Sequence, residues 1–202
     1  DITTYIAGGT ITAGQGISLL SRHNVDEEGD RTGLKADAHA TAPSGALLGS
    51  GTGADATAET AADLDTYVGS GVSLDAGGDI LLEALSADDA VSKTEGIAVS
   101  LGLSVGASLA GATSSGSTRA HMGGSVIRGA NLEITADGSN TAVAEAIAVA
   151  GGLIASGSGA DADATASPRV EAYLGDGSHV SVTDSVNISA AATPHADARG
   201  IG

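Results

Sequence analysis

An internal repeat constrains this chain more than any other feature of its sequence. Four anchor segments align, and the last of them reads AYLGDGSHVSVTDSVNISA from Ala172. Successive anchors are 62, 54 and 52 residues apart. All three tyrosines of the chain fall at one aligned position, which a histidine fills in the third segment: Tyr5, Tyr67, His121 and Tyr173. A repeat of this kind indicates structural units that stack on one another and contact mainly their neighbours.

Each anchor alternates apolar and polar residues with a period of two. In the fourth segment, serine, threonine and asparagine alternate with Val180, Val182, Val186 and Ile188. This alternation is typical of strands with one buried face, and the glycine and aspartate clusters between the apolar runs favour turns. No segment combines helix caps with a helical period. We therefore predict an all-β fold.

Short strands joined by tight turns in a stacking repeat predict a parallel β-solenoid, or β-helix. We expect strands of about five to seven residues and coils of about 20–27 residues, so that each repeat supplies two or three coils. Roughly eight to ten coils at the usual strand spacing would form a rod about 40–50 Å long. The alternative is an antiparallel β-sandwich or meander, whose strands alternate in the same way.

Large side chains are scarce in this chain. The 202 residues include 31 glycines and three tyrosines, but no phenylalanine, tryptophan or cysteine. Burial must therefore come from Ala, Val, Leu and Ile in a narrow interior, whereas ordinary cores of this size also use aromatic residues. A hydrophobic content of 42% lies above the range of disordered chains, so the composition favours a folded protein with a thin core.

The net charge of −17 at pH 7 argues against several classes of partner. Nucleic acids and anionic membrane surfaces attract clustered cations, but this chain has eight lysines and arginines against 25 acidic residues. The longest apolar stretch, residues 96–112, is interrupted by glycines and serines, so we expect no membrane span. The absence of cysteine removes disulfide and thiolate–metal chemistry and fits a secreted bacterial protein.

We expect residues 1–202 to be one continuous solenoid segment of a longer array. The first repeat is ten residues longer than the last complete one, and the segment 22–45 (RHNVDEEGDRTGLKADAHATAPSG) carries the insertion. This segment is predicted to leave the rod as a surface loop. The repeats cover about residues 1–62, 63–118, 119–169 and, in part, 170–202.

The segments VEAYLGDGSHVSVTDSVNISAAA and TYVGSGVSLDAGGDILLEALS resemble the repeats of giant bacterial surface adhesins and filamentous-haemagglutinin-like proteins. The stretch GGLIASGSGADADATA between two anchors resembles the Gly/Ala spacers of such proteins. The resemblance covers essentially the whole chain and includes no catalytic motif. It implies a secreted, right-handed β-helical stalk at the bacterial cell surface that acts in adhesion, aggregation or matrix formation.

Two acidic segments are candidates for binding a hard cation such as calcium. One surrounds a glycine in the predicted loop, and the other faintly resembles a calcium-binding nonapeptide. Neither has the ligand spacing of an EF-hand or the tandem glycine pairs of the nonapeptide, so solvated surface carboxylates are the favoured interpretation. No cofactor is predicted, and calcium stays an alternative. The candidate residues are Asp26, Glu27, Glu28, Asp30, Asp161 and Asp163.

Two further patterns have both a structural and a functional interpretation. The pentapeptide GLSVG places Ser104 in the G-x-S-x-G pattern of a hydrolase nucleophile, but a repeated strand region lacks the strand–turn–helix context that this motif needs. The tyrosine anchors are expected to pack at a corner of each coil, with the hydroxyl reaching water or a carbonyl. The alternative for the anchors is a platform that stacks on sugars.

These observations favour a non-enzymatic structural segment of an extracellular surface adhesin. Its partners would be neighbouring repeats or identical chains, with a host surface or a glycan as a further ligand. The alternatives are a calcium- or carbohydrate-binding β-helix module and, less favoured, a polysaccharide-degrading β-helix enzyme. An active site should interrupt one repeat, and only the segment 22–45 does so.

Overall fold

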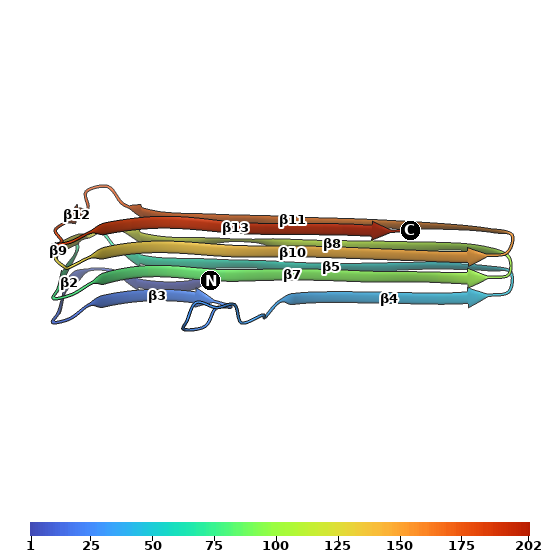
Figure 1. Cartoon of the computed structure of the whole chain (residues 1–202), viewed down its shortest axis with the longest axis horizontal. Coiled ribbons are helices and arrows are strands. Elements are labelled where there is room, and N and C mark those ends of the chain that lie inside the picture. The colour runs from blue at the N-terminus through green and yellow to red at the C-terminus, as the bar shows by residue number, and fades with distance from the viewer.

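A computed structural model describes residues 1–202 as a parallel β-solenoid of three sheets without any helix (Figure 1). Sheet A contains β1 (Ile2–Ile6), β5 (Gly49–Val68), β8 (Leu103–Met122) and β11 (Ala155–Leu174). Sheet B contains β2 (Gly9–Ala13), β6 (Val72–Ala76), β9 (Ser125–Arg128) and β12 (His179–Val180). Sheet C contains β3 (Ile17–His23), β4 (Ala36–Ala46), β7 (Ile80–Ser100), β10 (Leu132–Gly152) and β13 (Val186–Ile201). The predicted fold class is confirmed, and the antiparallel alternative is wrong because all these strands pair in parallel.

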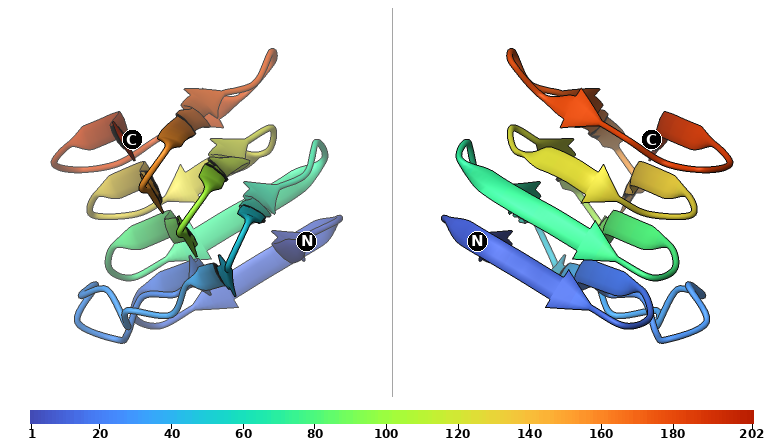
Figure 2. Two further views of the ribbon diagram at one scale, coloured as in Figure 1. Left: turned by 90° about the vertical axis from the view of Figure 1, so that its right-hand side faces the viewer. Right: turned by 90° about the vertical axis from the view of Figure 1, so that its left-hand side faces the viewer.

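Each repeat forms a single coil. β5 runs along sheet A, β6 passes through sheet B, and β7 returns along sheet C before the next coil begins with β8. Tyr5 pairs with Tyr67, and Ile80 pairs with Leu132, so the coils stack in the register of the sequence repeat. Figure 2 shows the coils as layers that follow one another in chain order along the stack.

The predicted coil length is wrong, because the strands of the two long sheets are far longer than expected. β5, β8 and β11 have 20 residues, and β7 and β10 have 21. Glycines that suggested turns lie inside these strands, where they let sheets A and C approach closely: a Cβ at Gly96 would lie 2.5 Å from the carbonyl oxygen of Ala107. At the usual strand dimensions the molecule is a slab about 70 Å long, with only about 15 Å between its first and last coils.

The interior changes from large to small side chains along the slab. Where all three sheets surround it, aliphatic side chains such as Leu74, Leu82 and Ile134 are completely buried. Where only sheets A and C face each other, the core is a cluster of alanines that includes Ala90 and Ala144. We call this second part the two-sheet arm. The narrow interior that the composition predicts is confirmed there.

The excursion predicted over 22–45 is shorter in the structure. Only residues 24–35 leave the coil, at the level where the next coil has residues 87–89. The residues that follow form β4 and pair with β7, because the period-two alternation resumes in ADAHATA. The excursion begins at Asn24, which adopts a left-handed conformation (φ 55°) that asparagine tolerates.

Candidate functional site

The four repeat anchors form a continuous aromatic ladder on the outer face of sheet A. Their rings stack in the order Tyr5, Tyr67, His121 and Tyr173, with centroids 5.2, 5.2 and 4.8 Å apart. The interplanar angles of 10°, 5° and 3° make the rings nearly parallel. This stacking follows from the register, because each anchor pairs with the anchor of the adjacent coil.

The geometry of the ladder suits contact between coils better than contact with sugars. A sugar that stacks on an aromatic residue needs an open ring face, but neighbouring rings cover both faces of Tyr67 and of His121. Only the two terminal rings each have one uncovered face. Aromatic pairs of this kind contribute about 0.5–1.5 kcal/mol beyond the area that they bury. The ladder therefore stabilises the stack of coils.

Ion pairs between adjacent coils lie on the same surfaces. The Asp65 carboxylate lies 3.3 Å from Nη2 of Arg119 and 3.2 Å from Nε2 of His121, beside the ladder. Nε of Arg128 donates to Asp75 at 2.7 Å on sheet B. Exposed pairs contribute little individually, typically below about 1 kcal/mol. Pairs between coils nevertheless place five of the eight lysines and arginines next to acidic groups of another coil.

The acidic candidates for metal binding are not assembled into a site. Oδ1 of Asp26 accepts the backbone N–H groups of Glu28 at 3.1 Å and of Asp30 at 2.8 Å, and these bonds close the excursion as a tight turn. Asp161 and Asp163 point outward from β11 into solvent. No group of three His, Asp or Glu side chains in the structure is arranged to hold a metal ion.

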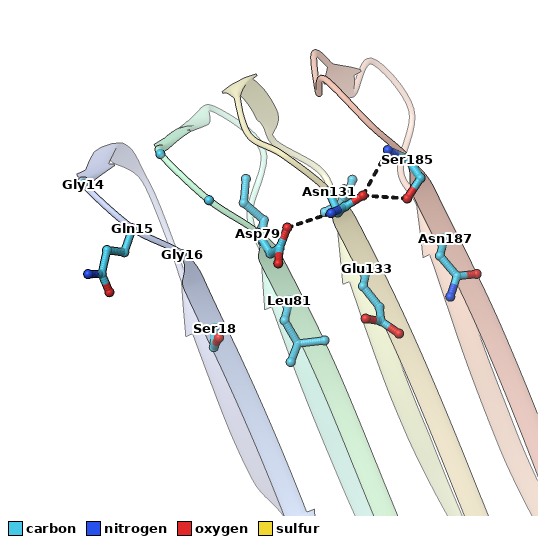
Figure 3. Close-up of a pocket in the computed structure, with 14 residues that line it drawn as sticks. Gly14, Gln15, Gly16, Ser18, Asp79, Leu81, Asn131, Glu133, Ser185 and Asn187 are labelled. Atoms are coloured by element: carbon cyan, nitrogen blue, oxygen red, sulfur yellow. Dashed lines mark hydrogen bonds between the residues drawn. The ribbon is translucent and has the colours of Figure 1, made fainter.

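An open polar groove crosses the coils where sheet B turns into sheet C (Figure 3). Its volume is about 730 Å³. Nδ2 of Asn131 donates to Oδ1 of Asp79 at 2.8 Å, and Oδ1 of Asn131 accepts the Ser185 hydroxyl at 2.7 Å and its backbone N–H at 3.1 Å. Glycine permits the close approach of the coils here, since a Cβ at Gly77 would lie 2.3 Å from the carbonyl oxygen of Gly14. The groove therefore presents a line of amide, hydroxyl and carboxylate groups to solvent.

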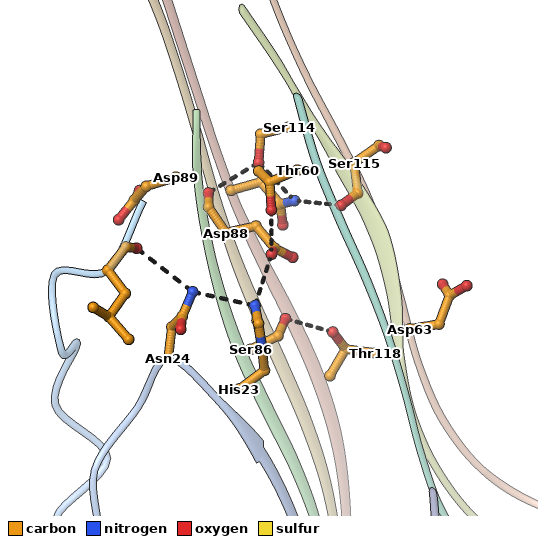
Figure 4. A network of polar contacts seen from close by, with 12 residues as sticks. His23, Asn24, Thr60, Asp63, Ser86, Asp88, Asp89, Ser114, Ser115 and Thr118 are labelled. Atoms are coloured by element: carbon orange, nitrogen blue, oxygen red, sulfur yellow. Dashed lines mark hydrogen bonds and ion pairs between the residues drawn. The ribbon is translucent and has the colours of Figure 1, made fainter. Parts of the chain in front are cut away.

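A band of polar side chains separates the aliphatic core from the alanine core inside the slab (Figure 4). Its centre is Asp88, which is 1% exposed. Oδ1 of Asp88 accepts the Thr60 hydroxyl at 2.9 Å and lies 3.2 Å from Nε2 of His23. Asn140 continues the band by donating to the Ser114 hydroxyl at 3.1 Å. Burying a carboxylate is costly unless it is paired, and these partners supply the pairing.

Neither the groove nor the buried band was predicted from the sequence, although both leave a signal in it. The hydrogen-bonded residues of the groove occupy one aligned position of the four coils, where every residue is small or polar: Gly16, Asp79, Asn131 and Ser185. In the sequence the buried band corresponds to Asp88 and Asn140, the charged and amide residues at inward-facing positions that are otherwise apolar or filled by serine, threonine and glycine. A polar residue at an inward-facing position indicates a buried partner.

The side chain of Ser104 points from β8 into the interior of the two-sheet arm rather than toward a substrate site. Its side chain is buried, and its hydroxyl has no hydrogen-bond partner. Ser104 is the second residue of β8, which continues as strand to Met122, so no helix follows the serine as a nucleophile elbow requires.

The chain forms no apolar helix of membrane-spanning length. Comparison with protein families, with curated proteins and with solved structures found no match to the chain.

Proposed function

We propose that the chain is a structural segment of an extracellular bacterial adhesin or surface filament, in which stacked coils form a stiff support. Its role is mechanical. Parallel ladders run through the coils of all three sheets, and the aromatic ladder continues the stacking on the outside. The placement at a cell surface rests on the resemblance of the anchor and spacer segments to repeats of bacterial surface adhesins.

Burial of inward-facing side chains by the next coil is the observation that best supports this proposal. Ile188 faces inward on the last coil, as does its register partner Ile134 on the coil below. Ile134 is completely buried, whereas Ile188 is 39% exposed because no further coil covers it. The backbone along β11 and β13 is likewise unpaired on its outer side. A further coil, from this chain's array or from an identical chain, would bury these groups.

The edge strands also contain a feature that limits indiscriminate pairing. The three prolines of the chain, Pro43, Pro168 and Pro194, all lie on edge strands: β4, β11 and β13. Proline lacks the N–H that a ladder needs, and it is found in sheets mainly at their edges. A partner strand can therefore pair along the whole edge only if its register does not require a hydrogen bond from the backbone nitrogen of these prolines.

Sedimentation velocity and electron microscopy at increasing protein concentration, with calcium and with a chelator, test the proposal. We expect assemblies that lengthen along the stacking axis, and we expect Ile188→Lys to suppress them by placing a charge on the open end. The matched control is Ser189→Lys, which adds the same charge on the outer face of the same strand. A wild-type chain that stays monomeric under all these conditions would refute self-assembly through the ends.

The polar groove favours carbohydrate binding as a second candidate function. Amide and carboxylate groups in a groove that crosses several coils match the hydroxyl-rich surface of an extended glycan. Calorimetry with a panel of polysaccharides should then give a heat of binding that Asp79→Ala abolishes and that Asp161→Ala, which changes an exposed carboxylate elsewhere, leaves intact. Binding that both variants retain would exclude the groove.

A further inference from the structure

The free end of the two-sheet arm contains no charged residue. This end, which we call the cap, consists of residues 42–54, 96–109 and 146–160 and includes the turns at the right-hand end of Figure 1. The rest of the chain carries all of the net charge of −17. A charge-free end on so acidic a protein is a distinct surface.

The boundary of the cap is at the same level on both long sheets. On sheet A, Asp55 and Asp161 both pair with Leu109. On sheet C, Glu95 pairs with Ile147, whose carbonyl oxygen accepts the Ser108 hydroxyl of sheet A at 2.6 Å. The cap therefore extends about six residues, or about 20 Å, from this level to the turns.

Inside the cap the usual distribution of side chains is reversed. Ala98, Ser100 and Ser104 fill the interior, whereas large apolar side chains point outward into solvent. Val105 is 61% exposed, and Leu48 in one of the turns is 87% exposed. An antiparallel or two-layer sheet normally presents polar residues to water, so an apolar outer face indicates a contact surface.

The outer face of the cap on sheet A has a relief that is complementary to itself. Leu103 and Val105 form a ridge on β8, and their register partners on the strands to either side are glycines and an alanine. The ridge of one copy fits the shallow groove over the glycines of another, and the reverse contact forms at the same time under twofold symmetry. The flanking residues are Gly49, Gly51, Ala155 and Gly157.

We propose that the cap is a contact surface between two copies of this chain. The caps of the two copies overlap, and the outer face of sheet A on one copy packs against the same face on the other. In this arrangement the charged parts of the two copies point away from each other, so the net charge does not oppose the contact strongly at physiological ionic strength. The cap residues are not needed for stacking through the first and last coils. The contact between caps is also independent of a role in adhesion.

A lipid bilayer is the competing apolar partner. The relief of the sheet A face favours a second copy, because a ridge flanked by glycines matches the same face of another copy, whereas a fluid bilayer requires only an apolar surface.

The size of the surface sets the strength of the contact. Three strands over about 20 Å give a flat area of about 300 Å² on each copy, well below the roughly 800 Å² per partner of a stable complex. We therefore expect reversible self-association at high concentration, which repetition of the cap along an array would strengthen.

Cysteine cross-linking tests the predicted geometry directly, because the chain has no cysteine of its own. The experiment uses full chains in an Ile188→Lys background, in which stacking through the ends is blocked. Val105→Cys and Gly51→Cys chains are mixed and oxidised, and the control pair places Thr113→Cys, eight residues further along β8, with Thr57→Cys. A Cβ at Gly51 meets no atom within 4 Å, so this cysteine fits the fold.

We expect the mixed disulfide between positions 105 and 51 to form at least about tenfold faster than the control disulfide, because the proposed contact raises its effective concentration. Val105→Asp should abolish concentration-dependent self-association in sedimentation, and Thr113→Asp should leave it unchanged. Equal cross-linking of the two pairs, or self-association that Val105→Asp does not alter, would overturn the inference. Binding to phosphatidylcholine vesicles that Val105→Asp abolishes, without self-association, would overturn it in favour of a lipid surface.

Discussion

Replacing Gly116 with alanine should destabilise the stack of coils severely. The φ angle of Gly116 is +136°, and a Cβ there would lie 2.3 Å from the carbonyl oxygen and 2.9 Å from the nitrogen of Ala62 on the adjacent coil. Its register partners are Ala62 and Pro168, so the aligned repeats alone would suggest that alanine is acceptable. The geometry predicts the opposite.

Two costs add at this position. A residue with a side chain pays about 1–3 kcal/mol to adopt a backbone conformation reserved for glycine. Forcing a methyl group against the backbone of a packed neighbour costs about 1–3 kcal/mol more. We expect the free energy of unfolding to fall by roughly 2–6 kcal/mol, which in a chain of this size lowers Tm by roughly 4–24 °C.

Thermal unfolding followed by far-ultraviolet circular dichroism measures the effect, with Gly51→Ala as the matched control. Gly51 lies in β5, has no positive φ and would place its Cβ in open space. There the same substitution should be neutral or stabilise by about 0.4–1 kcal/mol, because it restricts the unfolded chain. Equal Tm values for the two variants would refute the close approach of the coils at Gly116.

Four further substitutions probe the remaining layers of the fold. Leu82→Ala, in the aliphatic core, should lower the free energy of unfolding by about 2–5 kcal/mol, as chemical denaturation can measure. Ala144→Leu should cost at least about 1–3 kcal/mol in the same assay, because the arm cannot widen to accept a larger side chain; a neutral result would show that its interior is not close-packed. Asp88→Ala leaves the Thr60 hydroxyl without its acceptor and should cost about 1–3 kcal/mol, whereas Asp161→Ala on the surface should change stability by less than about 0.5 kcal/mol. Tyr67→Ala removes two stacking contacts of the ladder and should cost about 1–3 kcal/mol, and a smaller loss than for Tyr5→Ala would contradict the ladder.

The sequence was sufficient to predict parallel stacking but not the length of a coil. A tyrosine or histidine that recurs at one aligned position implies units that meet the same neighbour each time, and the register of Tyr5 with Tyr67 follows directly. Coil length depended on whether glycines such as Gly96 and Gly106 end strands or lie within them. Their role depends on the distance between sheets A and C, which residue type alone does not reveal.

The buried polar band was unpredictable for a related reason. In the sequence, Asp88 differs from a surface aspartate only in whether its position falls among the inward-facing or the outward-facing residues of the strand. That direction is fixed only when the strand is known to continue from Ile80 to Ser100. The partners of Asp88 come from three other strands: Thr60 from β5, Ser114 from β8 and His23 from the end of β3. Such a network is visible only after the coils are placed on one another.

The alanine core explains why the arm and its cap depend on contacts beyond a single coil. Burial of an alanine removes little apolar area from water, so an arm cored by residues such as Ala90 and Ala144 gains less hydrophobic stabilisation per residue than the three-sheet part around Leu82. Its long strands must be held mainly by the ladders of hydrogen bonds to the coils above and below, and the outermost coils have such a neighbour on one side only. Close approach of sheets A and C also leaves no interior space for the large apolar side chains of the cap, so Val99 and Val105 point outward into solvent. The same narrow interior that fixes the fold therefore leaves apolar surface in water, and the associations that we propose through the ends and through the cap would bury part of it.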